Sequence, residues 1–178
     1  MHPGCLVAAV LMLALQAGGA TVLDALRYER ASIASGQVWR LVSGQFIHFG
    51  WAHCLLNLGG LAMLATILPA AVRVGRCCLA LGTLIGLVLF FTMPGLQHYA
   101  GFSGILYGLA VVALLPRASK EPAAAVVLAA LAVRALWPWM GDGNADAAAW
   151  LGAPPLAAAH LAGLAAGALV LVVRRTAA

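Results

Sequence analysis

The sequence predicts an all-α membrane protein in which six helices cross the bilayer, and three observations support this fold class. Of its 178 residues, 64% are hydrophobic and only 8% are charged, whereas about a quarter of the residues of a soluble domain carry a charge. The mean hydropathy is +1.01. The apolar residues fall into six runs of helical length, and no stretch for a separate soluble domain remains between them. We therefore expect one membrane domain over residues 1–178 and a function that lies within the membrane.

The six runs define the expected spans, which cover residues 3–22, 52–72, 77–93, 102–115, 122–139 and 155–173. The first run could instead be a secretory signal, because Gly18 and Ala20 resemble a small-residue cleavage site. We interpret it as a retained span, since no Lys or Arg precedes it and the rest of the chain is membrane-embedded. Between the first two spans lies the only long polar connection, residues 24–52. Its interleaved aromatic residues favour a place in the headgroup layer.

The second and fourth spans carry polar residues at the ends where they begin. His53 and Asn57 lie four residues apart near the start of the second span, which puts them on one face of a helix. The fourth span has Ser103 as its second residue and covers only residues 102–115, or about 21 Å of helix. Because the hydrocarbon core is about 30 Å thick, the start of this span should lie below the membrane surface. We expect Ser103 in a cavity inside the bilayer.

Other charged and cysteine residues have simple structural interpretations. Arg134 lies near the end of the fifth span beside Trp137 and Trp139, as a snorkelling anchor would. The four cysteines lie in or beside apolar segments without a CxxC pair, which is typical of small buried hydrophobic residues. A polar connection, residues 141–154, leads to the sixth span.

The distribution of basic residues predicts the orientation in the membrane. Six spans place both termini on one side, and most of the Lys and Arg residues then lie at span ends on that side. These are Arg73, Arg76, Arg117, Lys120, Arg174 and Arg175. The positive-inside rule makes this side cytoplasmic. We interpret the net charge of +5 as this orientation signal and not as a nucleic-acid-binding surface.

Polar residues of the second, fourth and sixth spans should converge. All three spans run inward from the outer face, and each has its polar residues near its outer end, with His160 in the sixth. The last two also carry glycines four residues apart, Gly104 and Gly108, and Gly163 and Gly167. Such small-residue faces let two helices pack closely, which would bring Ser103 and His160 near hydrogen-bonding distance. Because polar side chains inside a membrane are costly, their convergence indicates a function.

These residue types suit nucleophilic catalysis. His160 would act as general base and remove the proton of Ser103, whose oxygen would attack a peptide carbonyl. The backbone N–H of Ser103 and the side chains of His53 and Asn57 would hold the resulting oxyanion. Every Asp and Glu lies outside the expected spans, so we predict a Ser-His dyad without a carboxylate. The same absence, together with the lack of an HExxH motif, disfavours a metal site, and we expect no metal or cofactor.

Structural interpretations of several of these residues remain open. His53 with Asn57 fits an interhelical hydrogen-bond clamp as well as it fits an oxyanion site. His48 and His98 fall near the interfaces, where we interpret them as polar anchors. Tyr107, one helical turn after the serine, is typical of a packed core.

Taken together, the motifs resemble those of the rhomboid family of intramembrane serine proteases over nearly the whole chain. Three family patterns are matched: Gly-x-Ser-Gly on the fourth helix by Gly101-Phe102-Ser103-Gly104, His-x-x-x-Asn on the second by His53 and Asn57, and His-x-x-Gly-x-x-x-Gly on the sixth by His160, Gly163 and Gly167. The pair Trp39-Arg40, the upstream His48 and Tyr107 also stand where the family has such residues. In the family, this tyrosine packs against the catalytic histidine.

The resemblance implies a six-helix rhomboid-like bundle in the inner membrane of a bacterium, with both termini cytoplasmic. It implies a serine endopeptidase that cuts membrane-anchored protein substrates in a transmembrane segment, with the lipid bilayer and no nucleic acid as its other partner. The sequence does not specify an oligomeric state. The catalytic residues would be Ser103 and His160, supported by Tyr107, Gly101, Gly104, Gly163 and Gly167.

The chain departs from the family pattern in two ways. Residues 68–71 read Leu-Pro-Ala-Ala where the family usually has an acidic and basic motif, and we expect no cytoplasmic domain. This minimal, Ala-rich form resembles the bacterial rhombosortase subgroup, which implies exported substrates with a C-terminal Gly-Gly, a short hydrophobic span and a basic tail.

Two other functions compete with proteolysis. A non-catalytic rhomboid-like protein would bind transmembrane helices and guide their trafficking or degradation, but such relatives typically lack the serine or the histidine. A small transporter would need broken helices within inverted repeats, and the sequence has no convincing repeat.

Overall fold

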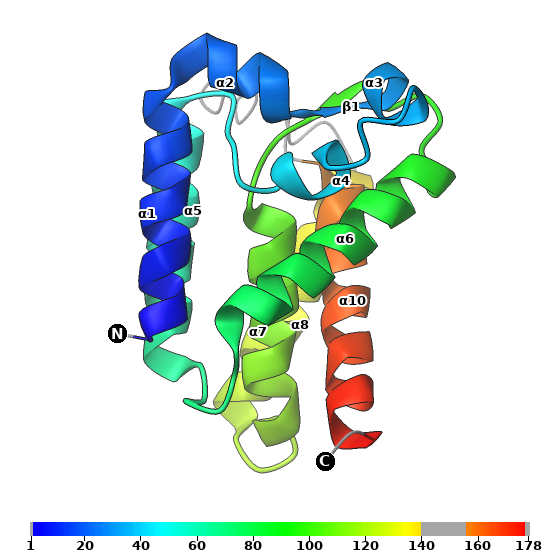
Figure 1. Cartoon of the computed structure of the whole chain (residues 1–178). Coiled ribbons are helices and arrows are strands. Elements are labelled where there is room, and N and C mark those ends of the chain that lie inside the picture. Colours follow the sequence, from blue (N-terminus) through cyan, green and yellow to red (C-terminus); the bar gives the residue numbers. More distant parts are fainter. Residues whose placement is uncertain (1, 140–155, 177–178) are drawn as a thin grey trace.

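The computed structural model describes residues 2–139 and 156–176, and these residues are mostly helical (Figure 1). The expected polar connection 141–154 and the first residue of the expected span 155–173 lie outside the described residues.

The long helices follow the apolar runs of the sequence. They are α1 (Pro3–Ala17), α5 (Trp51–Ile67), α6 (Val74–Thr92), α7 (Ser103–Leu114), α8 (Pro122–Leu136) and α10 (Ala157–Thr176). The shorter helices are α2 (Gly19–Leu26), α3 (Arg30–Ala34) and α4 (Arg40–Ser43). One 3-10 turn, Leu115–Arg117, follows α7, and another, Trp137–Trp139, follows α8. Two short strands, β1 (Tyr28–Glu29) and β2 (His98–Tyr99), pair in antiparallel fashion with Tyr28 opposite Tyr99.

The first apolar run does not form one straight helix. Residues 3–22 are broken at Gly18 and Gly19, and α2 leaves the direction of α1 at an angle of 113°. Gly19 has φ +62, a left-handed conformation that glycine adopts without steric cost. As a result, α2 lies across one end of the helices instead of continuing α1 (Figure 1).

The lengths of the helices bear on how the chain crosses a membrane. Among the described helices, α6 and α10 are long and apolar enough to do so, and the bent α1–α2 pair adds a third if it is one span. α5, α8 and the stretch Ser103–Arg117 are apolar but shorter. α5 ends at Ile67 and not at residue 72, because Leu68 precedes Pro69 and takes the extended conformation that a following proline favours. Helix length alone therefore does not establish six spans.

α7 lies at the centre of the packing, in contact with α5, α6, α8 and α10 (Figure 1). Its side chains Ile105 and Leu109 are fully buried. The contact with α10 runs through glycines: a Cβ atom added to Gly163 would overlap the carbonyl of Gly104, and one added to Gly108 would lie 3.0 Å from the carbonyl oxygen of Gly163. The contact expected between the two small-residue faces is therefore present, and larger residues would force the two backbones apart.

The connection between α1 and α5 folds over one end of the helices. We call residues 24–50 together with β2 the outer cap. Arg40 is buried within it and donates hydrogen bonds of 2.9 Å to the carbonyl oxygens of Asp24 and Arg27 and one of 2.7 Å to the side chain of Gln37. The β1–β2 pairing then attaches this connection to the segment that leads into α7.

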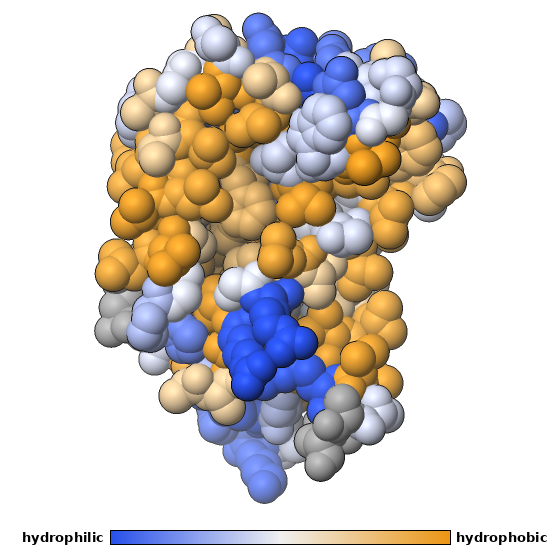
Figure 2. Space-filling model, in the orientation of Figure 1, coloured by the Kyte–Doolittle hydropathy of each residue, from blue (hydrophilic) through white to orange (hydrophobic). Residues whose placement is uncertain are grey.

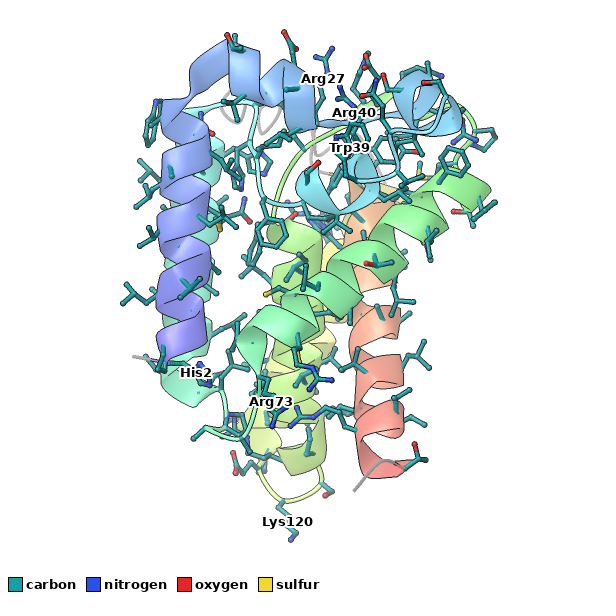
Figure 3. All side chains as sticks on the ribbon, viewed as in Figure 1. His2, Arg27, Trp39, Arg40, Arg73 and Lys120 are labelled. Atoms are coloured by element: carbon teal, nitrogen blue, oxygen red, sulfur yellow. The ribbon has the colours of Figure 1, made fainter. Side chains whose placement is uncertain are left out.

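Charged residues gather at the two ends of the molecule. Figure 3 shows Arg27, Trp39 and Arg40 at the outer cap, and His2, Arg73 and Lys120 toward the opposite end. Between the outer cap and the opposite end, much of the face drawn in Figure 2 is hydrophobic. A hydrophobic belt between two polar ends is the surface expected of a protein that sits in a bilayer.

Candidate active site

Ser103 is the first residue of α7, and it follows an N-cap residue, Phe102, whose side chain makes no hydrogen bond to the helix. The first N–H groups of a helix have no acceptor within that helix. The backbone N–H of Ser103 is one of these groups, and the serine side chain is only partly buried. The start of α7 therefore places a hydroxyl group next to N–H groups that could bind an anionic oxygen.

The turn before α7 requires a glycine for two reasons. Gly101 has φ +141, a backbone conformation that residues with a side chain rarely adopt. A Cβ atom at this position would also lie 2.7 Å from Cε1 of His53. The N–H of Gly101 donates a hydrogen bond of 3.0 Å to the carbonyl oxygen of Gly44 in the outer cap. The glycine thus lets the backbone pass close to the His53 ring.

α10 brings His160 to the start of α7. Oγ of Ser103 and Nε2 of His160 are 2.9 Å apart, and the histidine is only 5% exposed. Within the described residues, Nδ1 of His160 has no hydrogen-bond partner. A neutral imidazole has one donor and one acceptor nitrogen, so a Ser103 hydroxyl that donates to Nε2 requires the proton to be on Nδ1. In that state the ring can accept the serine proton.

Tyr107 lies one turn along α7 from Ser103, and its ring stacks on the ring of His160. The two ring centroids are 4.4 Å apart and the ring planes differ by only 5°. The sequence alone favours a packed position for Tyr107, and the structure shows that the residue it packs against is His160. The stacked rings restrict how the imidazole can rotate.

His53 and Asn57 lie one turn apart on α5, and the His53 ring reaches the turn before α7. The His53 ring lies against Gly101, as described above, and Asn57 is buried at 3% exposure. Nδ2 of Asn57 donates a hydrogen bond of 3.0 Å to the carbonyl oxygen of His53. Because an amide nitrogen carries two hydrogens, this bond leaves one further donor on the side chain.

His48 is not exposed, as the polar anchor expected here would be. It is buried at 2% exposure, its ring meets the ring of His53 edge to face at 4.9 Å, and its Nε2 accepts a hydrogen bond of 3.4 Å from the N–H of Phe102. Burial, and to a smaller degree the nearby His53 ring, lowers the pKa of His48 to about 3. The ring is therefore neutral and can act as an acceptor. The error arose because the fold of residues 44–50, which turns this histidine inward, depends on contacts made far along the chain.

Two buried polar residues beside the site were missed at the sequence level. The hydroxyl of Tyr99 donates to the carbonyl oxygen of Gly101 at 2.8 Å and lies 3.4 Å from Oε1 of Gln45. Tyr99 is 6% exposed and Gln45 is fully buried. In the sequence, both are only polar residues next to apolar segments. Many surface residues share this feature, so it does not indicate burial beside a site.

His98 is largely exposed, as expected of a polar anchor, and its Nε2 lies 3.2 Å from a carboxylate oxygen of Glu29. Among the residues that the structure describes, no three His, Cys, Asp or Glu side chains come close enough together to hold a metal ion.

Comparison with protein families adds an independent observation. The sequence model described as the Rhomboid domain matches residues 35–176, which include all of the site residues above. The chain belongs to the rhomboid family. A comparison with curated proteins gave no match. Rhomboid membership and the apolar helices indicate an integral membrane protein of a family that generally contains serine proteases and also has non-catalytic members.

Proposed function

We propose that this rhomboid protein is an intramembrane serine endopeptidase in which Ser103 is the nucleophile and His160 the general base. The observation that carries the proposal is the 2.9 Å contact between Ser103 Oγ and His160 Nε2 at the start of α7. The contact joins residues of two apolar helices, where polar side chains are costly unless they have a function.

The geometry supports the following sequence of steps. His160 Nε2 takes the hydroxyl proton as Oγ of Ser103 attacks the carbonyl carbon of the substrate peptide bond. The negative charge on the carbonyl oxygen is held by the N–H at the start of α7. His160 then gives its proton to the leaving amine, and a water molecule, activated by the same histidine, hydrolyses the acyl-enzyme.

His53 and Asn57 complete the oxyanion site in this proposal. Asn57 has one amide hydrogen that is not used by the carbonyl of His53, and the His53 ring lies against Gly101, two residues before the nucleophile. The His53 ring therefore lies beside the backbone that would bind the oxyanion, and Asn57 follows it by one turn of α5. The alternative, an interhelical clamp, predicts a loss of stability without a change in rate, and the two outcomes are separated below.

We further propose that α1, α5, α6, α8, α10 and the stretch 103–117 each cross the inner membrane of a bacterium, with both termini cytoplasmic. The basic residues support this orientation. Arg117 donates to the carbonyl oxygen of Ile67, and Arg174 donates to that of Ala71, so both arginines cover the end of α5 opposite the outer cap. The positive-inside rule places this end in the cytoplasm.

The proposed substrates are membrane-anchored proteins. A peptide bond within a helix must be unwound before Ser103 can attack it, and glycine lowers this cost by about 1 kcal/mol relative to alanine. Cleavage is expected near the outer end of the substrate's span, beside small residues. The rhombosortase-like form of the chain favours substrates with Gly-Gly before a short C-terminal span. Two substrates that differ only in Gly-Gly or Leu-Leu before the span test this, and equal cleavage would refute the subgroup while leaving proteolysis in place.

A non-catalytic, helix-binding rhomboid protein is the alternative function. It has no need for a serine and a histidine in hydrogen-bond contact, whereas this chain has both. Labelling with a fluorophosphonate probe separates the two functions. We expect the wild-type protein in liposomes to be labelled and the Ser103→Ala variant to remain unlabelled. A folded wild-type protein that is not labelled and does not cleave membrane-anchored substrates would favour the binding function.

A further inference from the structure

One peptide group beside the site has both its carbonyl oxygen and its N–H in hydrogen bonds to buried side chains. The carbonyl oxygen of the Gly101–Phe102 peptide accepts a hydrogen bond of 2.8 Å from the Tyr99 hydroxyl. The N–H of the same peptide donates a bond of 3.4 Å to Nε2 of His48. Both partners are buried side chains from the outer cap, and neither bond is part of a helix or a strand.

The orientation of this peptide affects the proposed oxyanion site. Gly101 has φ +141, and the absence of a side chain leaves its backbone free to adopt several conformations. Rotation of the Gly101–Phe102 peptide by half a turn would exchange the directions of its carbonyl oxygen and its N–H, and would bring the oxygen to the side of the His48 ring. The His48 ring meets the ring of His53, a proposed oxyanion donor, so a carbonyl oxygen on that side would repel the oxyanion.

We propose that Tyr99 is a positioning residue that, with His48, fixes the Gly101–Phe102 peptide and thereby keeps its carbonyl oxygen away from the oxyanion. The inference rests on the proposed proteolytic function. It assigns to Tyr99 no contact with the substrate and no proton transfer.

The surroundings of Tyr99 hold its hydroxyl in place. Its backbone is paired with Tyr28 through β1 and β2, and its ring is only 6% exposed. Nε2 of Gln45 donates to the carbonyl oxygen of Leu41 at 3.4 Å, which leaves Oε1 of Gln45 on the side of the Tyr99 hydroxyl at 3.4 Å. Burial raises the pKa of Tyr99, so the phenol stays protonated and remains a donor.

The test compares two identical substitutions in the paired strands. Tyr99→Phe removes the hydroxyl that holds the peptide. Tyr28→Phe removes the hydroxyl of an equally buried tyrosine whose oxygen faces Arg30 at 3.5 Å. In liposomes with a membrane-anchored substrate, we expect Tyr99→Phe to lower kcat about three- to tenfold, the effect of one hydrogen bond. KM should be unchanged because the oxyanion forms only in the transition state. Labelling of Ser103 by the fluorophosphonate should slow by a similar factor.

The outcomes separate the inference from the proposed function. A wild-type protein that cleaves, with equal kcat for Tyr99→Phe and Tyr28→Phe, would overturn the role of Tyr99 alone. A wild-type protein that neither cleaves nor becomes labelled would overturn the proposed function and the inference with it.

The hydrogen bond from the N–H of Phe102 to His48 provides a second pair of variants in case Tyr99→Phe does not fold. His48→Gln keeps an acceptor for the N–H of Phe102, whereas His48→Leu removes it. We expect kcat to fall for His48→Leu and to be at least partly restored for His48→Gln. Equal loss in both variants would contradict a role in holding the peptide.

Discussion

The contact between α7 and α10 and the outer cap are stabilised by different forces. Glycines of α7 and α10 bring the two backbones together, so that van der Waals contact determines the distance between the helices. The outer cap is held by polar bonds: Arg40 binds carbonyl oxygens, and Glu29 accepts from Ser32 and pairs with Arg27. The first contact sets the distance between Ser103 and His160, while the second sets the backbone that precedes Ser103. The two regions should therefore respond to different changes.

The largest effect should come from the two residues that the helix contact brings together. We expect Ser103→Ala, His160→Ala and the double variant each to reduce proteolysis to background while the proteins stay folded. Because the two side chains act as a unit, the double variant should be little worse than either single one. Turnover of a membrane-anchored substrate in liposomes measures this. Substantial activity in either single variant would refute the dyad.

A smaller loss is expected from residues of α5, which lies beside both regions. His53→Ala and Asn57→Ala should each lower kcat by roughly ten- to a thousandfold, as loss of one oxyanion donor does. Thermal unfolding measured on the same preparations distinguishes the two interpretations. Variants that unfold at a lower temperature but cleave at the normal rate would establish the interhelical clamp instead.

Two glycine substitutions test the contact between α7 and α10, one within the contact and one outside it as a control. Gly163→Val places atoms where the carbonyl of Gly104 lies, so we expect destabilisation of about 3 kcal/mol, the upper end of the usual range for overpacking. The same change at Gly59 on α5 meets nothing within 4 Å and should alter the stability by less than about 0.5 kcal/mol. Denaturant unfolding in detergent measures both. A Gly163→Val protein as stable as Gly59→Val would contradict the close contact.

The smallest effect concerns pH and is confined to the outer cap. Hydrogen bonds from Ser32 and His98, with the charges of Arg27 and Arg40, lower the pKa of Glu29 from its ordinary value of 4.5. A depressed folded-state pKa means that the carboxylate stabilises the fold above pH 4.5 and loses this contribution as the pH falls through the lower, folded value. Thermal unfolding at pH 7 and pH 3 should show a larger drop for the wild type than for Glu29→Gln. Equal drops would show that Glu29 contributes nothing.

Much of the helical framework could be predicted because apolar runs and local breaks determine it. The runs at 77–93 and 122–139 match α6 and α8 with its 3-10 turn closely. The bend after Ala17 could not be placed, because a Gly-Gly pair within an apolar run is equally compatible with a continuous helix. Its angle depends on the packing of the outer cap.

In the candidate site, too, some residues could be predicted from the sequence and others could not. Ser103 and His160 could be paired from sequence, since the glycine spacing of their helices predicts which faces meet. The burial of His48 and the bonds of Tyr99 and Gln45 could not be predicted, because they depend on how residues 44–50 and β2 fold against each other. Such contacts between irregular segments have no periodic signal in the sequence.

In the proposed protease, the short helix that begins at Ser103 would set the depth at which a substrate is cut. From Ser103 to Arg117 the helix and its 3-10 turn extend about 20 Å. In the proposed orientation, Arg117 lies at the inner boundary of a hydrocarbon core of about 30 Å, which would put the serine hydroxyl about 10 Å inside the outer boundary. A helical substrate advances about 1.5 Å per residue. In the proposed protease, we therefore expect the scissile bond about six or seven residues inside the outer end of the substrate's hydrophobic segment. Moving Gly-Gly away from this position should lower the cleavage efficiency.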